Sequence, residues 1–239
     1  MAFKKPTNLT SWSISRYHTW KTCPASAKYK FIDKIPEPAS PAMERGSDIH
    51  KLAEEYLKGK KRILPKELKL FRDLFKELRG YCSKLTQVTH IEASWAFRND
   101  WSQTVFNDWA NCWLRVKLDF AVFLPEGNVL NVIDWKTGKF REYNIQDYIE
   151  QLELYALSAM KFNPSIEKVV PKLVYLDTGD TYPPESDPLV FTKADVKGLQ
   201  KKWEKAVAPM LKDTRFPPKP NNTCRWCNFS AAKGGPCKF

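Results

Sequence analysis

Two acidic side chains and a lysine are the residues whose types and spacing could do chemistry in this chain. Asp119 lies in an apolar run, Pro125 to Asn128 has the composition of a turn, and a second apolar run ends in Asp134-Trp135-Lys136-Thr137-Gly138. Carboxylates are hard oxygen ligands that suit Mg²⁺ or Mn²⁺, and a neighbouring lysine can hold or polarise an attacking water. The trio therefore favours metal-dependent cleavage of a phosphodiester.

A β-hairpin would position this trio. Asp119 is predicted to point to one face of its strand, and the alternating apolar residues to the other: Val116, Leu118, Phe120 and Val122. Residues 129–136 are rich in branched side chains and predict the returning strand, on which Asp134 and Lys136 share a face. The same alternation is typical of any half-solvated hairpin, so the hairpin alone leaves a purely structural interpretation open.

Two predicted helices carry further polar candidates. Ser47 is expected to cap a helix that bears His50 at the edge of its buried stripe, which consists of Ile49, Leu52, Ala53, Tyr56 and Leu57. A second amphipathic helix, over residues 144–160, places Gln151 and Tyr155 one turn apart on a shared edge. Taken singly, a helical histidine or a Gln-x-x-x-Tyr pair is more often structural than functional.

The order of these motifs is more specific than any one of them. Gly46-x-x-x-His50, the isolated strand acid Asp119, Asp134-x-Lys136-Thr137-Gly138 and Gln151-x-x-x-Tyr155 resemble the RecB-like branch of the PD-(D/E)xK nuclease superfamily. The resemblance runs from about Ser13 to the end of the chain. It implies an α/β, restriction-endonuclease-like core with a mixed central sheet flanked by helices.

The resemblance also implies roles for these residues. Metal ligands would be His50, Asp119, Asp134 and the backbone carbonyl of Trp135. Lys136 would be the catalytic lysine, and Gln151 and Tyr155 would support it and contact the substrate backbone. Glu92 stands where many members have a further acid, and an exposed strand carboxylate is its alternative interpretation.

The cysteines narrow the expectation further. Cys224, Cys227 and Cys237 lie in a tail too poor in apolar residues to build much core, which a bound metal would order. Cys23-Pro24, ten residues after Ser13-Ile14-Ser15-Arg16 begins, resembles the N-terminal cysteine segment of iron-sulfur members: CRISPR-associated RecB-like exonucleases, AddB-type subunits and phage relatives.

That resemblance implies a [4Fe-4S] cluster on Cys23, Cys224, Cys227 and Cys237, in a cysteine-ligated subdomain that joins the two ends of the chain. The nine residues between Cys227 and Cys237 exceed the usual family spacing, so Zn²⁺ or free thiols stay open as alternatives. The two other cysteines, Cys82 and Cys112, are predicted to be small buried hydrophobic residues.

Composition agrees with a nucleic-acid enzyme. The 239 residues include 39 basic and 27 acidic side chains, for a formal net charge of +12, and 43% are hydrophobic, enough to fill a sizeable core. We expect an N-terminal segment (1–45), a nuclease core (46–200) and a basic helix with the cysteine tail (201–239). No stretch has the length and apolarity of a membrane span, so an intracellular, cytoplasmic protein of a prokaryotic or phage-infected cell is expected.

Periodicity and turn residues predict the secondary structure. Helices are expected over residues 15–31, 45–58, 65–84, 144–160 and 192–211, and strands over 91–98, 105–107, 113–123, 129–136 and 168–177. The expected function is a metal-dependent DNA exonuclease for single strands or DNA ends, in phage DNA processing, recombination or CRISPR-type trimming. No phosphate-binding loop of the ATPase type occurs, so an ATP-driven step would belong to a helicase, recombination or CRISPR partner. The alternative is a non-catalytic subunit that binds DNA or a partner and has a structural metal tail.

Overall fold

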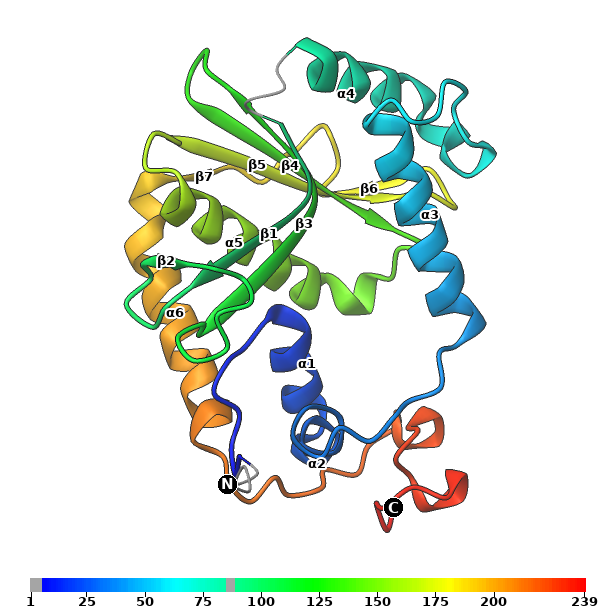
Figure 1. The fold of residues 1–239 in the computed structure, drawn as a ribbon, viewed down its shortest axis with the longest axis vertical. Coiled ribbons are helices and arrows are strands. Elements are labelled where there is room, and N and C mark those ends of the chain that lie inside the picture. Colours follow the sequence, from blue (N-terminus) through cyan, green and yellow to red (C-terminus); the bar gives the residue numbers. More distant parts are fainter. Residues whose placement is uncertain (1–5, 85–88) are drawn as a thin grey trace.

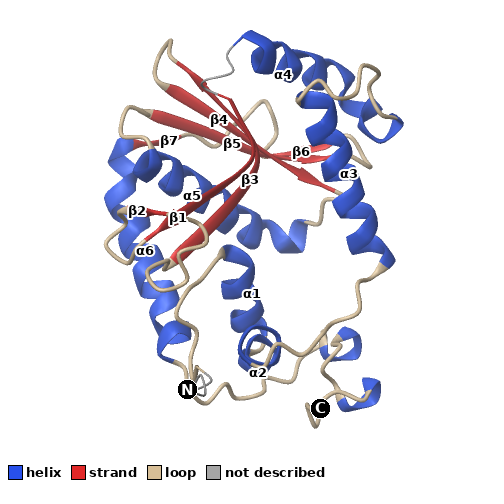
Figure 2. Ribbon diagram, in the orientation of Figure 1, coloured by secondary structure: helices blue, strands red, loops and turns tan. Residues whose placement is uncertain are grey.

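A mixed β-sheet carries helices on both faces (Figures 1 and 2). The computed structural model describes residues 6–84 and 89–239; residues 1–5, the start of the expected N-terminal segment, and 85–88 lie outside the described part. The strands are β1 (Thr89–Phe97), β2 (Gln103–Thr104), β3 (Leu114–Leu124), β4 (Val129–Lys136), β5 (Lys168–Tyr175), β6 (Asp180–Tyr182) and β7 (Phe191–Thr192).

The strand order is β2-β1-β3-β4-β5-β6, and β7 pairs with β5. β4 and β5 are parallel, because the chain returns between them through a long helix, and the other pairings are antiparallel. The helices are α1 (Ile14–Thr22), α2 (Pro24–Ala27), α3 (Pro41–Leu57), α4 (Arg72–Lys84), α5 (Ile145–Phe162) and α6 (Lys193–Lys212). The expected mixed sheet flanked by helices is confirmed.

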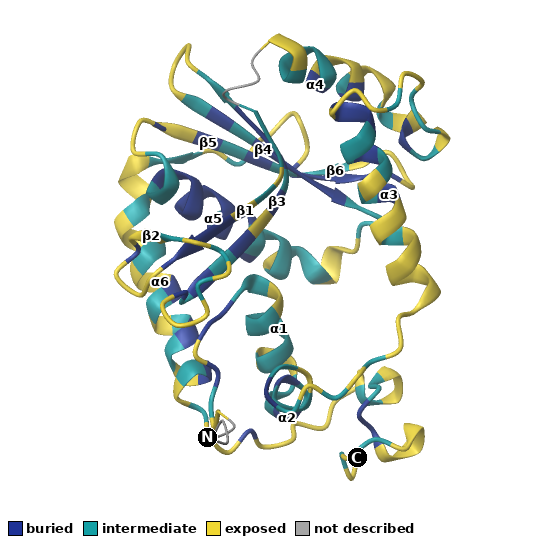
Figure 3. Cartoon of the chain, viewed as in Figure 1, coloured by how far each residue is buried: buried dark blue, intermediate teal, exposed yellow. Residues whose placement is uncertain are grey.

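Two hydrophobic clusters hold the helices to the sheet. On one face, α5 and α6 pack in a cluster that includes Leu152, Trp203 and Val132. On the other face, α3 and α4 pack in a cluster that includes Phe75 and Trp135. The strands and the middle of α5 are the most deeply buried parts of the chain (Figure 3). No helix in the described residues is both long and apolar enough to cross a bilayer.

The apolar residues of β3 do not stay on one face, contrary to expectation. Val116 and Leu118 pack in the α5–α6 cluster, whereas Phe120 and Val122 pack in the α3–α4 cluster. The change falls at Asp119, and β1 changes at the neighbouring residue Glu92, whose φ of 53° breaks the extended conformation. In both strands, therefore, the apolar side chains change from one hydrophobic cluster to the other at neighbouring positions of the sheet.

The helical prediction for residues 15–31 is divided in the structure. α1 ends before Cys23, which is extended with φ of −157°, and α2 begins at Pro24. The pyrrolidine ring disfavours a helical conformation in the residue before it, which explains the break. A short π-helical turn over Lys28–Ile32 then completes the segment.

Several boundaries also differ from the sequence expectation. α3 begins at Pro41, not at residue 45, because the side chain of Ser40 accepts from Met43 N–H and caps the helix; Ser47 lies inside it and is no cap. A 3₁₀ turn over Lys66–Phe71 precedes α4. The strand expected over 105–107 is a turn, and β2 lies just before it, while the short edge strands β6 and β7 were not predicted.

Candidate active site

Three acidic residues stand in one row across β1, β3 and β4. In the β3–β4 pair Phe120 lies opposite Ile133, so continuing that register by one residue sets Asp119 opposite Asp134. In the β1–β3 pair Ile91 lies opposite Phe120 and Ala93 opposite Leu118, so Glu92 faces Asp119 from the other side. This row is also the place where the apolar side chains of β1 and β3 change from one hydrophobic cluster to the other.

His50 joins this row from α3. Its Nδ1 lies 3.3 Å from Asp119 Oδ1, and one ligand atom from each of His50, Glu92 and Asp119 falls within 4.8 Å of the others. Two carboxylates and an imidazole form a donor set that could hold a divalent cation such as Mn²⁺ or Mg²⁺. Glu92 reaches the group although it is an exposed residue of a strand.

Burial and neighbouring charges shift the pKa values of Asp119, Glu92 and His50. Burial and the negative charge of Asp134 raise the pKa of Asp119, against the lowering effect of His50. Burial and the charge of Asp119 likewise raise the pKa of Glu92. Burial lowers the pKa of His50, but the hydrogen bond and charge of Asp119, with the charges of Asp134 and Glu92, outweigh it and raise that pKa. Crowded carboxylates of this kind are stabilised by a bound cation.

The hairpin itself is fastened by Asp119. Its Oδ2 accepts a hydrogen bond from the Trp135 backbone N–H at 2.7 Å. The Trp135 indole points into the opposite core, where its ring centroid lies 4.8 Å from that of Phe75. Asp119 therefore has a structural contact through one oxygen and meets His50 through the other.

Asp134 and Lys136 meet α5 on the other side of the row. Asp134 Oδ2 lies 2.6 Å from Lys136 Nζ, and Lys136 Nζ donates to Gln151 Oε1 at 3.1 Å. The Gln151 amide nitrogen donates to Asp134 Oδ1 at 3.0 Å, and the Tyr155 hydroxyl donates to the same oxygen in a very short contact. Burial and the charges of Asp134 and Asp119 raise the pKa of Tyr155, which keeps its hydroxyl a neutral donor.

All the catalytic and metal-site candidates from the sequence meet at this point. They form two groups of contacts, one of His50, Glu92 and Asp119 and one of Asp134, Lys136, Gln151 and Tyr155. The Trp135 backbone N–H, which donates to Asp119 Oδ2, joins the two groups. The lysine and the two aspartates arise from the hairpin, whereas the others depend on how the helices pack on it. The Trp135 carbonyl as a metal ligand stays a prediction.

Two residues that hold the motif turn were missed by sequence reasoning. Asp177, just after β5, accepts from Gly138 N–H at 2.7 Å and pairs with Arg45 of α3 at 2.6 Å. The φ of Gly138 is 93°, in the left-handed region that glycine adopts without steric cost, which allows the tight turn. No sequence signal marks Asp177, which resembles any acid in a turn.

Gly46 of the Gly-x-x-x-His motif also contacts this turn. A Cβ added at Gly46 would lie 3.3 Å from Thr137 Oγ1, so the glycine permits close approach of α3 to the Asp-x-Lys-Thr-Gly segment. Through Gly46 and Arg45, the helix that carries His50 is set directly against the turn that follows Lys136.

The segment that leads to the cysteine tail contacts the end of α1 and Cys23, and the tail lies beside α2 (Figure 1). Lys219 N–H donates to Cys23 Sγ at 3.4 Å, Asn221 N–H donates to Cys224 Sγ at 3.4 Å, and the rings of Tyr29 and Phe229 lie 5.6 Å apart. Burial and the charges of Cys237, Cys23 and Cys227 raise the pKa of Tyr29. These contacts join the residues after α6 to Cys23 and to Tyr29.

The two surplus cysteines lie elsewhere. Cys112 is buried before β3, and its thiol contacts the Leu114 carbonyl at 3.4 Å, so that its expected burial is confirmed. Cys82, on α4, is half-buried against the α3–α4 cluster, and burial raises the pKa of its thiol.

Comparison with known proteins defines the class. The family model of the PD-(D/E)XK nuclease superfamily matches residues 11–232, and the chain belongs to this superfamily. Its members are nucleases that use divalent metal ions, and the family implies DNA as the substrate. The acidic group with His50 agrees with that metal requirement.

A solved structure has the same fold. A crystal structure from Eubacterium rectale, named "Putative exonuclease", matches with a TM-score of 0.50 and 12% sequence identity, over 95% of this chain and 90% of that one. At this identity the likeness shows the fold alone. No curated protein matches the sequence.

Proposed function

We propose that the chain is a metal-dependent DNA exonuclease of the RecB-like branch, acting on single strands or DNA ends. The observation that supports this most is the acidic row with His50 on one side and the Lys136–Gln151 contact on the other. A cation held by His50, Asp119, Asp134 and the Trp135 carbonyl, with Glu92 at hand, would neutralise phosphate charge and make a bound water more acidic.

The chain's own groups divide the remaining work. Lys136, held from two sides by Asp134 and Gln151, would offer its ammonium to the attacking water or to a phosphate oxygen. Tyr155, whose raised pKa keeps it protonated, would fix Asp134 Oδ1 and so the carboxylate plane. Gln151 is proposed to position the lysine and to contact the substrate backbone.

The four cysteines are proposed to bind a [4Fe-4S] cluster that joins the segments 1–45 and 201–239 over the core. Two thiol sulfurs accept backbone N–H groups, as sulfurs of iron-sulfur sites do. The proposal rests on the resemblance of Cys23 and the cysteine tail to iron-sulfur members of the family, and a zinc site is its alternative.

The nuclease proposal is tested with end-labelled linear DNA, single- and double-stranded, in Mn²⁺, Mg²⁺ or EDTA. Metal-dependent loss of label from the ends is expected for the wild type and should be about 10²–10³-fold slower for Lys136→Ala. A folded, metal-supplied wild type that leaves DNA intact would instead favour the non-catalytic binding subunit. The proposal also includes a pathway, which is phage DNA processing, recombination or CRISPR-type trimming, and a helicase partner. These parts are tested in cells and not with the purified protein.

The cluster proposal has a test that does not use DNA. Anaerobically purified protein should show iron, sulfide and broad visible absorption, all lost in Cys227→Ser, whereas Cys82→Ser should keep them. Stoichiometric zinc without iron in the wild type would contradict the cluster assignment and leave the nuclease assignment untouched.

A further inference from the structure

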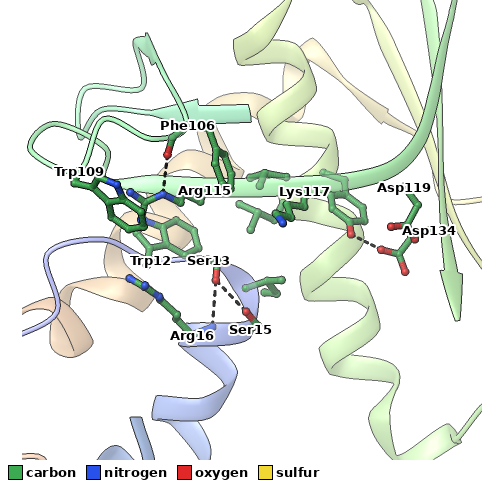
Figure 4. Close-up of a pocket in the computed structure, with 14 residues that line it drawn as sticks. Trp12, Ser13, Ser15, Arg16, Phe106, Trp109, Arg115, Lys117, Asp119 and Asp134 are labelled. Atoms are coloured by element: carbon green, nitrogen blue, oxygen red, sulfur yellow. Dashed lines mark hydrogen bonds between the residues drawn. The ribbon is translucent and has the colours of Figure 1, made fainter. Parts of the chain in front are cut away.

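A cavity of about 370 Å³ opens beside the acidic row and extends away from it (Figure 4). Asp119 and Asp134 line one end, Lys117 lies next to them, and Trp109 and Arg16 lie at the far end. Its volume is within the range of about 300–1,000 Å³ that is usual for ligand sites. None of the proposed catalytic roles uses the far end.

Two arginines at the far end lack a counter-charge. Arg16 Nη1 and Arg115 Nη1 both donate to Ser11 Oγ, at 2.8 and 3.1 Å. Among the described residues no carboxylate pairs with either guanidinium, and Arg115 Nη2 is buried without a hydrogen-bond partner. Burial and the charge of Arg115 lower the pKa of Arg16, so an anion between them would relieve repulsion. Guanidinium groups suit the oxygens of a phosphate.

An exposed indole stands next to this pair. Trp109 is 70% exposed, and the Arg115 guanidinium lies 4.0 Å from its ring centroid. Hydrogen bonds within its loop hold the backbone in place, because Asp108 accepts from Thr104 Oγ1 at 2.9 Å and from Asn111 N–H at 3.2 Å. A fixed, solvent-facing indole beside arginines is the arrangement on which bases of single strands stack.

The cavity continues into the proposed active site. It shares Lys117 and Asp119 with a wider cavity of about 810 Å³ that is lined by His50 and Glu92. Arg115 and Asp119 are four residues apart on β3, about 13 Å at about 3.3 Å per residue. That span corresponds to at most about four nucleotides at the stacked spacing of about 3.4 Å. The capped start of α1, with Ser13 and Ser15, forms the adjoining wall.

We propose that this cavity binds the single-stranded DNA next to the cleaved phosphate. Arg16 and Arg115 contact a backbone phosphate, and one base stacks on Trp109. The inference rests on the proposed function, since it takes the acidic row as the place of cleavage. It deepens that function by assigning a strand-binding site at a fixed distance from the reacting phosphodiester.

The test measures binding without cleavage. Full-length protein with Lys136→Ala, a residue that does not line the cavity, is titrated in EDTA with short single-stranded oligonucleotides. Each oligonucleotide carries 2-aminopurine at one of the first four positions from either end, so that stacking is seen as quenching. Trp109→Ala is compared with Trp226→Ala, because Trp226 is 71% exposed and lies under Arg225, with 5.5 Å between guanidinium and ring.

Trp109→Ala is expected to weaken binding by about 5- to 150-fold, the equivalent of about 1–3 kcal/mol per stacked base. It should also remove the quenching at one 2-aminopurine position, and Trp109→Phe should retain most of both. Trp226→Ala should change affinity by less than about twofold. Unchanged affinity and quenching in a folded Trp109→Ala protein, or equal losses in both tryptophan variants, would overturn the proposal.

Cleavage by the wild type is scored separately on the same oligonucleotides. Binding that depends on Trp109 in a protein that never cuts would support the cavity and refute the nuclease. Normal cutting with binding independent of Trp109 would refute the cavity and support the nuclease.

Discussion

Gln151 is expected to act on cleavage through Lys136. Lys136 Nζ has two side-chain partners in the structure, Asp134 at 2.6 Å and Gln151 at 3.1 Å. If the amide only positions the lysine, then Gln151→Ala should slow the chemical step in the wild type and have no further effect once Lys136 is alanine. If the amide contacts the substrate backbone by itself, the two effects should multiply.

The contacts give the size of each effect. Loss of one preorganised donor directed at the developing charge costs about 2.7–4 kcal/mol, so Lys136→Ala should lower kcat by about 10²–10³-fold. Loss of one hydrogen bond to a charged group costs about 1.5–3 kcal/mol, so Gln151→Ala should lower kcat by about 13- to 160-fold. The double variant should match Lys136→Ala to the extent that the amide acts through the lysine, and a loss beyond that measures its hydrogen bond to Asp134 Oδ1 or its contact with the substrate backbone.

The assay is single-turnover cleavage of end-labelled single-stranded DNA at saturating metal. Gln200→Ala is the matched control. Gln200 of α6 accepts a hydrogen bond from Lys161 Nζ of α5 at 2.7 Å, and this lysine–glutamine pair lies outside the acidic row. It should leave the rate within about twofold. A double variant slower than Lys136→Ala by the full Gln151→Ala factor would refute the positioning argument and assign the amide to the substrate.

Two further predictions concern stability. Metal at about 100 times its Kd should stabilise the wild type by about 2.7 kcal/mol, which raises Tm by about 5–11 °C. In scanning calorimetry Asp119→Asn should lose this gain, although its amide oxygen can still accept from Trp135 N–H. An equal gain in the variant would disprove the ligand role of Asp119. Burial raises the pKa of Glu150, but hydrogen bonds from Lys21 and His18 outweigh it and lower that pKa below 4.5. The carboxylate therefore contributes stability above pH 4.5, and this stability is lost as the pH falls through the folded-state pKa. The unfolding free energy of Glu150→Gln should therefore be lower than that of the wild type at pH 7, and the difference should shrink as the pH falls below 4.5; a difference that does not change with pH would contradict this sign.

Local patterns were sufficient for the hairpin part of the site. Asp119, Asp134 and Lys136 lie near one another, as the hairpin predicts, because a short turn leaves little freedom in the register of two adjacent strands. The 3.6-residue period likewise predicts that Gln151 and Tyr155 share an edge of α5, and in the structure the Gln151 amide donates to the Tyr155 hydroxyl. In these cases the residues that must meet are close in sequence or are ordered by one helix.

Contacts between distant segments could not be read in the same way. Glu92 enters the row only because β1 pairs with β3 and turns through a left-handed φ, which no residue type announced. Ser40 caps α3 ahead of Ser47 because Pro41 can occupy the first helical turn, a competition between two serines that spacing alone left open. Asp177 reaches Gly138 across 39 residues, through the parallel pairing of β4 and β5.

The charge balance of the site connects these observations. The acidic row stands where the side chains of β1 and β3 change from one core to the other, and it brings three carboxylates together at a cost to the fold. Structural sites avoid such crowding, because an apolar row would be more stable. At the far end of the cavity that Asp119 lines, Arg16 and Arg115 are crowded with like charge, and no carboxylate of the described residues pairs with them. A cation at one end and a phosphate at the other would relieve both, and a DNA strand with its metal supplies the two charges together.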